Sequence, residues 1–340
     1  MAALLANAQA ASNHAIEIIF STRPETPENF SRLFDKNIKL TNVQMNSLKE
    51  KLLSIYKIRK ILSNSKPDQI FMHSSFAGFL GRIAGLNILH ASRFFYIPHC
   101  IAFMRKDVGP LKRIIFILFE WIASIKKADY IACSESERSA ITTNIPFRKC
   151  HMVENAINLN RPPVDNEQVN LHNKIIVITV GQIRPQKGPL QFALIAAALK
   201  KINPAIEFVW VGDGEPLARQ QLLNAGVNVV GWIPKDDVWQ YLKKSTIYLS
   251  TAKWEGMPVS VIEANIAGLP VVASHCAGNI DVIEHNKTGW LFKTTDEAVQ
   301  QILFALKHAE LTADLAQRTA NIARTRFSVE RYVNDMNSLI

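Results

Sequence analysis

Two glutamates, Glu255 and Glu263, are the residues of this sequence whose type and spacing best suit chemistry. Between them runs Gly256-Met257-Pro258-Val259, where the glycine permits a turn and the proline favours the start of a helix. The free amides of this segment would point out of the helix start and, with the helix dipole, form an anion site. An anion site between two carboxylates suits a sugar joined to a diphosphate. A capped helix with an exposed Glu263 is the alternative.

A basic loop, Gly181–Gly188, holds two further candidates, Arg184 and Lys187. It follows a predicted strand and precedes a predicted helix. Either side chain could therefore donate charge-assisted hydrogen bonds to a phosphate at the carboxyl edge of a sheet. The spacing is not that of a Walker loop, and an ordinary basic loop is the alternative. The segment Gly212-Asp213-Gly214 is interpreted as a structural turn.

Short apolar runs rich in β-branched residues predict the strands that would position these loops. In the second half they are Ile175–Val180, Phe208–Val211, Val227–Val230, Ile247–Ser250, Pro270–Ser274 and Trp290–Phe292. Segments with helical spacing alternate with them, a pattern typical of a parallel sheet covered on both faces. The ligand site of such a sheet lies at the carboxyl ends of its strands, where both candidate loops begin. The first half shows a similar but less regular order.

The composition of the 340-residue chain predicts a globular protein with two domains. Hydrophobic residues make up 48% and charged residues 20%, which argues against a disordered chain, and no apolar run is long enough to cross a membrane. None of the four cysteines lies in a C-x-x-C pair or has the spacing of a zinc site. We therefore expect reduced thiols and a cytoplasmic protein.

The positive charge is concentrated in the first half of the chain. Residues 1–165 carry 22 Lys and Arg against 13 Asp and Glu, whereas residues 166–340 carry 17 against 16. This excess indicates an anionic partner, with a solvated basic face as the alternative. The segment 105–127 has basic ends and an apolar middle with Trp121, which suits either an anionic membrane surface or a core helix. No nucleic-acid motif is present, and we expect no nucleic-acid partner.

Five motifs follow one another along the second half of the chain. They read V-G-Q-I-R-P-Q-K-G, V-W-V-G-D-G, V-V-G-W-I-P, W-E-G-M-P-V-S-V-I-E-A-N-I-A-G-L-P-V-V-A-S and T-G-W-L-F. The first half adds K-P-D before H-S-S-F-A-G, then I-P-H at Ile97–His99 and N-A-I at Asn155–Ile157. Together these passages resemble glycosyltransferase family 4, whose members are retaining, nucleotide-sugar-dependent enzymes of the GT-B fold. The resemblance covers most of the chain.

The resemblance implies a role for each candidate residue. Glu263 would hold the ribose hydroxyls of the donor, and Glu255 would lie beside the transferred sugar as a catalytic residue. Lys187, also assigned to catalysis, and Arg184 would neutralise the diphosphate leaving group. The other implied site residues are His99, near the sugar from the first domain; Gly256, Met257, Pro258 and Val259, at the sugar and phosphate; and Trp232 and Ile233, beside the base.

The resemblance also implies an architecture, which is an α/β fold with two Rossmann-like domains facing across a cleft. We expect an acceptor-side domain over residues 1–160, a linker over 161–172 and a nucleotide-sugar domain over 173–325. A final helix within 326–340 is expected to return to the first domain. No metal and no cofactor are expected, because no D-x-D motif occurs and a lysine with helix amides can replace a metal at the diphosphate.

Three features depart from the family pattern. Gln182 stands at a usual arginine, and Asn279 and Asp281 replace a glycine and a glutamate. The third departure concerns the first domain, where residues 1–11 resemble the end of the family's first helix and residues 15–20 its second strand. Either the start codon is misplaced, or the first domain lacks its first strand and the glycine-rich loop that approaches the donor. This loss predicts lower stability and weak or absent transfer by the chain.

These expectations lead to one function and two rivals. The function is retaining transfer of a hexose from a nucleotide sugar to a surface-polysaccharide or lipid-linked saccharide acceptor, as in lipopolysaccharide or capsule biosynthesis. It would be performed by a cytoplasmic protein, peripheral on the inner face of the cell membrane. The rivals are a nucleotide-sugar 2-epimerase on the same fold, and a truncated relative that binds nucleotide without catalysis. Release of sugar and nucleotide without an acceptor would mark the epimerase.

Overall fold

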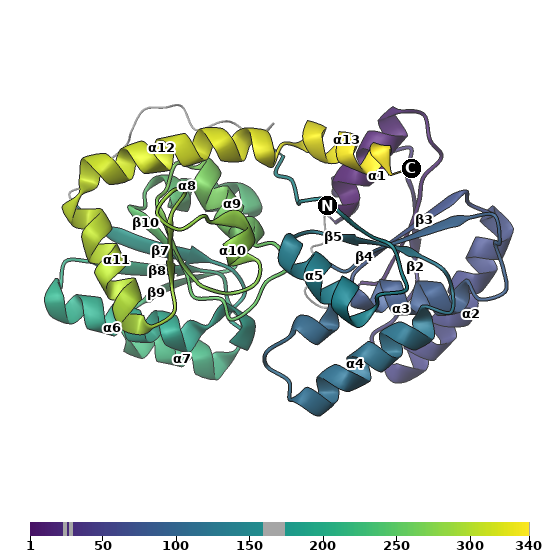
Figure 1. Cartoon of the computed structure of the whole chain (residues 1–340), viewed down its shortest axis with the longest axis horizontal. Helices are drawn as coiled ribbons and strands as arrows, with labels where there is room; N and C mark the ends of the chain where they lie inside the picture. Colours follow the sequence, from purple (N-terminus) through teal and green to yellow (C-terminus); the bar gives the residue numbers. More distant parts are fainter. Residues whose placement is uncertain (23–25, 27–29, 159–173, 340) are drawn as a thin grey trace. The chain divides into compact units, whose positions relative to one another are not determined.

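The computed structural model describes residues 1–22, 26, 30–158 and 174–339, which form two compact units. Unit 1 comprises Met1–Met104, Val108–Glu154 and Val333–Ile340, and unit 2 comprises Arg105–Asp107 and Asn155–Tyr332. Each unit is an α/β body built on parallel strands (Figure 1). The predicted linker, residues 161–172, lies outside the described residues.

Unit 2 contains a six-stranded parallel sheet in the order β12-β11-β10-β7-β8-β9. Its strands are β7 (Ile176–Val180), β8 (Glu207–Val211), β9 (Asn228–Gly231), β10 (Ile247–Ser250), β11 (Val271–Ser274) and β12 (Trp290–Phe292). All six predicted strands are confirmed to within one residue at each end. The chain leaves β7 toward β8 on one side, whereas β10 on the other side leads toward β11. The strand order therefore switches between β7 and β10.

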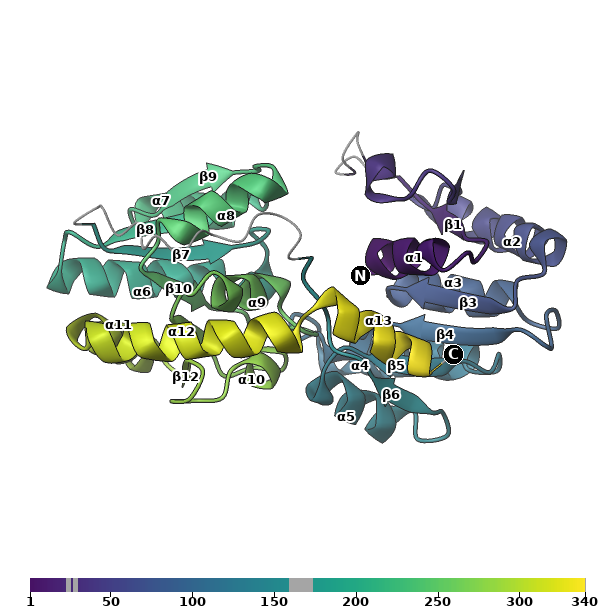
Figure 2. The same cartoon turned by 90° about the horizontal axis from the view of Figure 1, so that it is seen from above.

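Helices cover both faces of this sheet, as the sequence pattern predicts (Figures 1 and 2). Residues of α6, α7 and α11 share one hydrophobic core with the sheet, to which Leu315 of α12 also contributes, and α12 packs against α9. The helices are α6 (Pro189–Ile202), α7 (Pro216–Asn224), α8 (Lys235–Lys243), α9 (Val259–Ile266), α10 (Asn279–Val282), α11 (Thr295–Lys307) and α12 (Ala309–Arg326), with the short 3-10 helix η3 (Pro185–Lys187). The buried strands are nearly all apolar because both of their faces are covered.

The strands of unit 1 form two separate parallel sheets. One contains β3 (Gln69–His73), β4 (Arg93–Ile97), β5 (Asp129–Ala132) and β6 (Cys150–Met152) in that order, and the other pairs β1 (Glu17–Phe20) with β2 (Lys39–Asn42). Within the described residues, no ladder joins β1 to β3.

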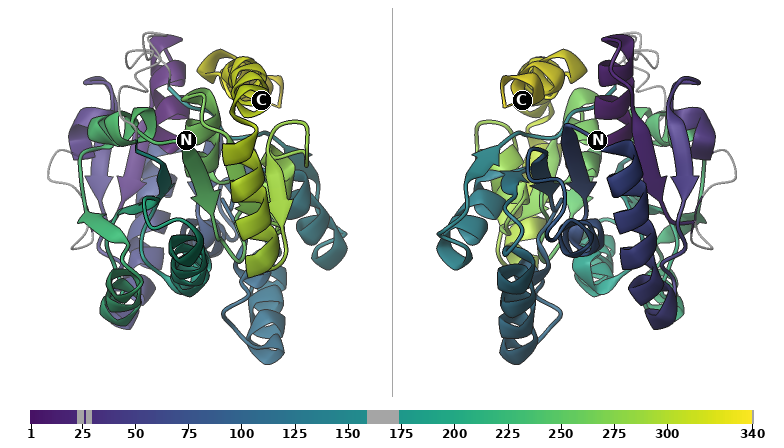
Figure 3. Two further views of the ribbon diagram at one scale, coloured as in Figure 1. Left: turned by 90° about the vertical axis from the view of Figure 1, so that its left-hand side faces the viewer. Right: turned by 90° about the vertical axis from the view of Figure 1, so that its right-hand side faces the viewer.

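Helices of unit 1 lie above and below these strands in the view of Figure 1, with α1 above and α4 below (Figures 1 and 3). They are α1 (Ala2–Ala11), α2 (Leu48–Ser65), α3 (Ser75–Ala84), α4 (Pro110–Ala123) and α5 (Glu135–Asn144), with the 3-10 helices η1 (Phe30–Leu33) and η2 (Ala102–Met104). The last helix, α13 (Val329–Ser338), begins in unit 2, and its residues from Val333 belong to unit 1. Strands β2 and β6 and helix α5 were not predicted from the sequence.

A buried ion pair anchors α4 to the core of unit 1. Arg82 of α3 is fully buried, and its Nη2 lies 2.7 Å from Oε2 of the buried Glu120 of α4. The hydroxyls of Tyr96 and Tyr130 donate to the same carboxylate at 3.2 and 3.0 Å. The guanidinium lies 4.5 and 5.4 Å from the centroids of these two rings. Both charges can be buried here because each is paired and hydrogen-bonded.

We predict that Glu120→Ala lowers the free energy of unfolding of unit 1 by about 3–5 kcal/mol, because it leaves the Arg82 guanidinium buried without its partner. Hydrogen exchange of peptides from β3 to β5, followed by mass spectrometry over a urea series, would measure the loss. The double variant Arg82→Met/Glu120→Leu removes both charges and should lose much less.

Glu135→Ala is the matched control for this prediction, since Glu135 forms an exposed ion pair with Arg138 at 2.9 Å. Its removal should change the stability by less than about 1 kcal/mol. A loss in Glu120→Ala no larger than in this control would contradict the anchoring role.

Candidate active site

The loops that follow β7 and β10 meet through an ion pair at the switch point of the unit 2 sheet. Lys187, at the end of η3, places its Nζ 2.8 Å from Oε1 of Glu255. The two side chains are only 19% and 10% exposed. In open parallel sheets the crevice beyond the strand ends at such a switch point is where ligands bind. The structure thus brings together two of the residues that the sequence singled out.

Glu255 is held from two further directions. Gln186 donates through Nε2 to Glu255 Oε2 and to the Trp254 carbonyl, both at 3.0 Å. The Glu255 amide donates to the Ala277 carbonyl at 2.9 Å, which links it to the loop after β11. Each carboxylate oxygen therefore has a partner, and the orientation of the carboxylate is set by neighbouring loops. Gln186 was not among the predicted site residues, because nothing in its spacing distinguishes it from a solvent-facing loop residue.

Two glycines permit the close approach of these loops. Gly188 has a φ of +65°, and a Cβ there would lie 2.0 Å from the Thr251 carbonyl oxygen. Gly278 has a φ of +88°, and a Cβ there would lie 2.5 Å from the Cβ of Glu255. Any larger residue would push the loop after β7 or β11 away from the loop that carries Glu255.

The ion pair keeps Lys187 positively charged. Burial lowers the pKa of the Lys187 ammonium, but the Glu255 carboxylate and Tyr248 outweigh this effect, and the net pKa lies above its ordinary value. A buried cation at the carboxyl edge of a parallel sheet provides a fixed positive potential for an anionic group.

The segment before α9 is buried and held by a residue from far earlier in the chain. The Asn155 side chain donates through Nδ2 to the Met257 carbonyl at 3.2 Å, and the backbone N–H of Asn155 donates to the Met257 sulfur at 3.3 Å. Gly256, Met257 and Pro258 are buried, and Pro258 occupies the N-cap, so that α9 starts at Val259. Asn155 belongs to the N-A-I passage of the sequence, which gave no hint of this contact.

Glu263 lies inside the protein, so the alternative of an exposed glutamate is wrong. It is 5% exposed on α9, and Lys235 at the start of α8 approaches its Oε1 at 3.2 Å. Glu263 is thus a second buried carboxylate, and it lies on α9, the helix that begins shortly after Glu255. The Lys235 side chain of this pair is 61% exposed, whereas that of Glu263 is only 7% exposed.

Three other predicted site residues are more exposed than this pair. Arg184 is exposed at the start of η3, and Trp232 is 65% exposed between β9 and α8. Ile233 beside it is half-buried. The structure therefore gathers Lys187, Glu255 and the start of α9, and leaves these three residues at the surface or partly covered.

The remaining candidate, His99, lies in unit 1 at the carboxyl end of β4. Its Nε2 is 2.9 Å from Nδ1 of His73, at the carboxyl end of β3, and the rings stack with centroids 5.2 Å apart. One nitrogen of this contact carries the hydrogen and the other accepts it. Burial lowers the pKa of His99 to about 4 and that of His73 well below its ordinary value. Both imidazoles are therefore neutral at physiological pH.

The backbone at His99 is unusual. His99 and Cys100 have φ values of +56° and +101°, a region that residues with a Cβ seldom adopt. Each such residue costs roughly 1–3 kcal/mol and persists only where its surroundings hold it.

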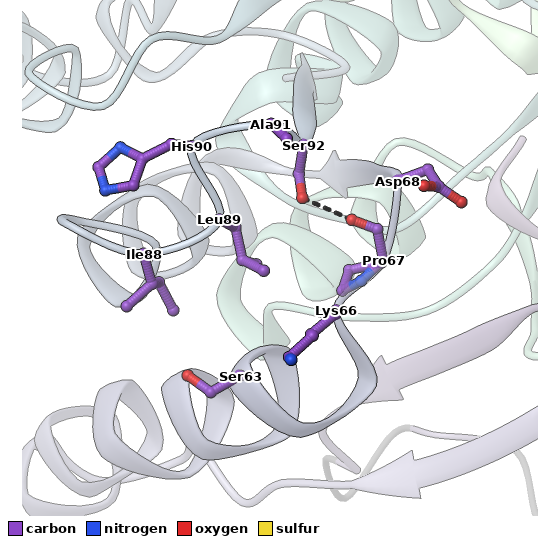
Figure 4. A pocket seen from close by; sticks show the side chains of 9 residues that line it. All are labelled: Ser63, Lys66, Pro67, Asp68, Ile88, Leu89, His90, Ala91 and Ser92. Carbon is purple, nitrogen blue, oxygen red and sulfur yellow. Dashed lines mark hydrogen bonds between the residues drawn. The ribbon is translucent and has the colours of Figure 1, made fainter.

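A separate hollow in unit 1 lies at the opposite edge of the sheet (Figure 4). Its volume is about 470 Å³, and its lining includes Lys66–Asp68, just before β3, and Ile88–Ser92, just before β4. The Ser92 hydroxyl donates to the Pro67 carbonyl across its floor. Since it borders the amino ends of the strands, it is not where a parallel sheet places its ligand.

Family models match both halves of the chain. Residues 162–323 match the model described as "Glycosyl transferases group 1", and residues 1–161 match "Glycosyltransferase Family 4". The chain is a family 4 glycosyltransferase. The fold and family that the sequence motifs predicted are thereby confirmed.

Individual relatives of this glycosyltransferase include enzymes of polysaccharide assembly. It is 27% identical over 74% of its length to an Escherichia coli protein, covering 68% of it, named UDP-Gal:alpha-D-GlcNAc-diphosphoundecaprenol alpha-1,3-galactosyltransferase. It is 31% identical over 45% of its length to the amylovoran biosynthesis glycosyltransferase AmsK of Erwinia amylovora, covering 42% of that protein.

Solved structures share its fold. Anabaena Alr3699/HepE, in complex with UDP and glucose, superposes with a TM-score of 0.78 at 18% identity, covering 99% of this chain and 94% of that one. The sucrose-phosphate synthase of Thermosynechococcus elongatus gives a TM-score of 0.82 at 18% identity, covering 98% and 90%. At this identity the likeness concerns the fold alone, which confirms the GT-B prediction.

We predict that the stability of unit 1 falls as the pH drops from about 6.5 to about 4. The unfolded His99 has an ordinary pKa near 6.5 and the folded one a pKa of about 4, so in this window the unfolded chain binds more protons. Unfolding of unit 1, followed by hydrogen exchange at pH 7.5, 6 and 5, would measure the slope. His99→Asn, which tolerates the positive φ and does not titrate, should make the slope shallower. An unchanged slope would show that His99 is not buried as a neutral group.

Proposed function

We propose that this glycosyltransferase moves a hexose from a nucleotide sugar to a saccharide of a surface polysaccharide or of its lipid-linked precursor, and that the sugar keeps its anomeric configuration. The observation that carries the proposal is the buried Lys187–Glu255 ion pair at the switch point of the unit 2 sheet. A cation and a carboxylate at one strand edge, next to the amides that start α9, suit a ligand with an anionic and a hydroxyl-rich end.

The names of relatives support the donor and acceptor classes. The Escherichia coli relative is named for transfer from UDP-galactose to an undecaprenol-linked N-acetylglucosamine, and the Erwinia relative for amylovoran synthesis. The Anabaena structure contains UDP and glucose. We infer by likeness that the donor here is also a nucleoside-diphosphate sugar and that the acceptor belongs to capsule or lipopolysaccharide assembly.

The chemistry follows from where charge develops. As the nucleoside diphosphate leaves the sugar, negative charge grows on its phosphate oxygens, and fixed positive groups there lower the barrier. The Lys187 ammonium has three hydrogens, so it can donate to a phosphate oxygen while keeping Glu255 as a partner. The amides of the Gly256–Val259 segment would hold the phosphate and sugar, and Glu255 would accept hydroxyl hydrogens of the sugar.

The other proposed roles concern the two ends of the donor and the acceptor side. Glu263 would accept the ribose hydroxyls, Arg184 would add a second cation at the diphosphate, and Trp232 and Ile233 would border the base. His99 would act near the sugar as a neutral imidazole. We propose attack from the face that the diphosphate leaves, which requires no covalent nucleophile, and a diphosphate neutralised by Lys187 and helix amides without a metal.

We predict that Lys187→Ala, Glu255→Gln and Glu263→Gln each lower transfer by about 100-fold or more, as removal of one hydrogen-bonding group from the transition state does in other enzymes. A radiolabelled nucleotide sugar, screened over donor bases with a lipid-linked acceptor, would measure kcat and KM. Lys253→Ala is the matched control, because Lys253 is an exposed lysine of the Glu255 loop, and it should retain activity.

Two outcomes would favour the rivals. Release of free sugar and nucleotide without an acceptor would identify an epimerase, and a thermal shift with nucleotide without turnover would identify a non-catalytic relative. Full activity of Lys187→Ala and Glu255→Gln would contradict the proposed site.

We propose further that α4 rests on an anionic membrane surface, from the cytoplasmic side. Leu111, Ile115, Leu118, Ile122 and Ile125 recur at helical spacing on and just beyond α4, and their exposed fractions are 70%, 39%, 50%, 50% and 71%. Apolar side chains in such a row leave a large hydrophobic surface in water unless something covers it. Among the described residues, no helix combines the length and apolarity needed to cross a bilayer.

The positive charge at the two ends of α4 favours an anionic lipid surface as the partner that covers the apolar row. Lys112 and Lys127 are exposed near the start and past the end of the helix. An amphipathic helix with basic ends lies in the interface of an anionic bilayer, with its apolar row among the acyl chains. An acceptor carried on a lipid would be presented at that surface.

We predict that Leu118→Ser/Ile122→Ser lowers binding to phosphatidylglycerol vesicles about tenfold or more, because each buried aliphatic side chain contributes about 1.5–3 kcal/mol when fully covered. Co-sedimentation at low salt would measure it. Leu190→Ser/Leu194→Ser on α6 is the matched control, since these leucines are 54% and 52% exposed outside the row. Equal loss in both pairs, or no binding by the unaltered chain, would remove the membrane proposal.

A further inference from the structure

A buried carboxylate in unit 1 has backbone amides as its partners. Glu137, in the first turn of α5, is fully buried. Its Oε1 accepts from the amides of Cys100 and Ile101 at 2.7 and 2.8 Å, and its Oε2 accepts from the amide of Cys133 at 2.9 Å. Oε2 thus accepts from the loop that leads into α5, and Oε1 accepts from the turn that follows β4.

The turn after β4 has an unfavourable backbone conformation that other contacts must stabilise. Its residues His99 and Cys100 have φ values of +56° and +101°, which are unfavourable for residues that carry a Cβ. Glu137 accepts from the two backbone amides that directly follow His99, those of Cys100 and Ile101. A carboxylate that accepts two neighbouring amides fixes the direction in which those amides point, and so fixes the turn.

The direction of the turn sets the direction of the His99 ring. With this backbone, His99 Nε2 meets His73 Nδ1 at 2.9 Å, and the rings lie within 16° of parallel. A return of His99 and Cys100 to negative φ would turn the imidazole away from His73. The contact between the two rings therefore depends on a conformation that the chain does not favour by itself.

We propose that Glu137 is a positioning residue for His99: its carboxylate holds the turn at residues 99–101 in its left-handed conformation and thereby aims the His99 imidazole. The proposal rests on the proposed function of His99 near the transferred sugar. It differs from a role in helix capping, because the cap of α5 is the Ser134 hydroxyl, which accepts from the Glu137 backbone amide at 3.1 Å.

The first test replaces the carboxylate with its neutral isostere in the full chain. Glu137→Gln keeps the shape but turns an NH2 group toward backbone amides, and we expect kcat to fall at least tenfold while KM for the nucleotide sugar stays within twofold. Combining it with Cys100→Gly should restore much of kcat, since glycine adopts a φ of +101° without the carboxylate's help. A merely structural carboxylate would not be rescued in this way.

Glu135→Gln is the matched control, because Glu135 lies two residues earlier on α5 with an exposed side chain. Its transfer activity should equal that of the unaltered chain. If Glu137→Gln does not fold, Cys100→Val serves instead: it leaves the carboxylate in place and penalises the positive φ, and it should lower kcat in the same way. Where His99→Ala lowers kcat, normal kcat in both Glu137→Gln and Cys100→Val would overturn the proposal.

A spectroscopic readout separates this proposal from the proposed function. In chains with ¹⁵N-labelled histidine, Glu137→Gln should shift the His99 ring resonances, and Cys100→Gly should shift them back. If His99→Ala leaves transfer unchanged while these shifts occur, His99 has no role in transfer but Glu137 still positions it. An unshifted His99 spectrum in Glu137→Gln would overturn the positioning role, as would a further tenfold loss when Glu137→Gln is added to His99→Ala.

Discussion

The Lys187–Glu255 ion pair is the interaction on which the unit 2 site depends. It joins two loops that leave neighbouring strands in opposite directions around the sheet, and both groups are largely removed from water. A single charge left in this position would cost about 3–5 kcal/mol, so each residue makes the other tolerable. The glycines at 188 and 278, the Gln186 amide and the Asn155 side chain all serve to bring loops close enough for this pair to form.

Pairing also explains how a cation and a carboxylate can both be buried at this strand edge, since each compensates the charge of the other. In unit 1 the unfavourable feature is a strained backbone, not a buried charge, and it too is compensated by a neighbouring group. There, two residues with positive φ place a neutral histidine pair at the strand ends, and a buried carboxylate compensates the amides of the turn.

The sequence predicted the parts of the fold that rest on local pattern. Runs such as Ile176–Val180 and Ile247–Ser250 are apolar throughout because both sheet faces are covered, and they were found almost to the residue. Helix α5 was missed because Glu135–Asn144 is rich in Ser, Thr and Glu, and β6 because three residues carry no period. The site showed the same limit. Spacing identified Lys187, Glu255 and Glu263, whereas Gln186, Asn155, His73 and Glu137 act through contacts between loops that only the topology brings together.

The anchoring of α4 has a practical consequence for work on the molecule. Arg82, Glu120 and the two tyrosines hold the buried side of this helix, while the row from Leu111 to Ile125 occupies the exposed side. The two sides can therefore be redesigned independently. Serine or lysine substitutions along the outer row should lower the exposed apolar surface of the protein and leave its interior untouched.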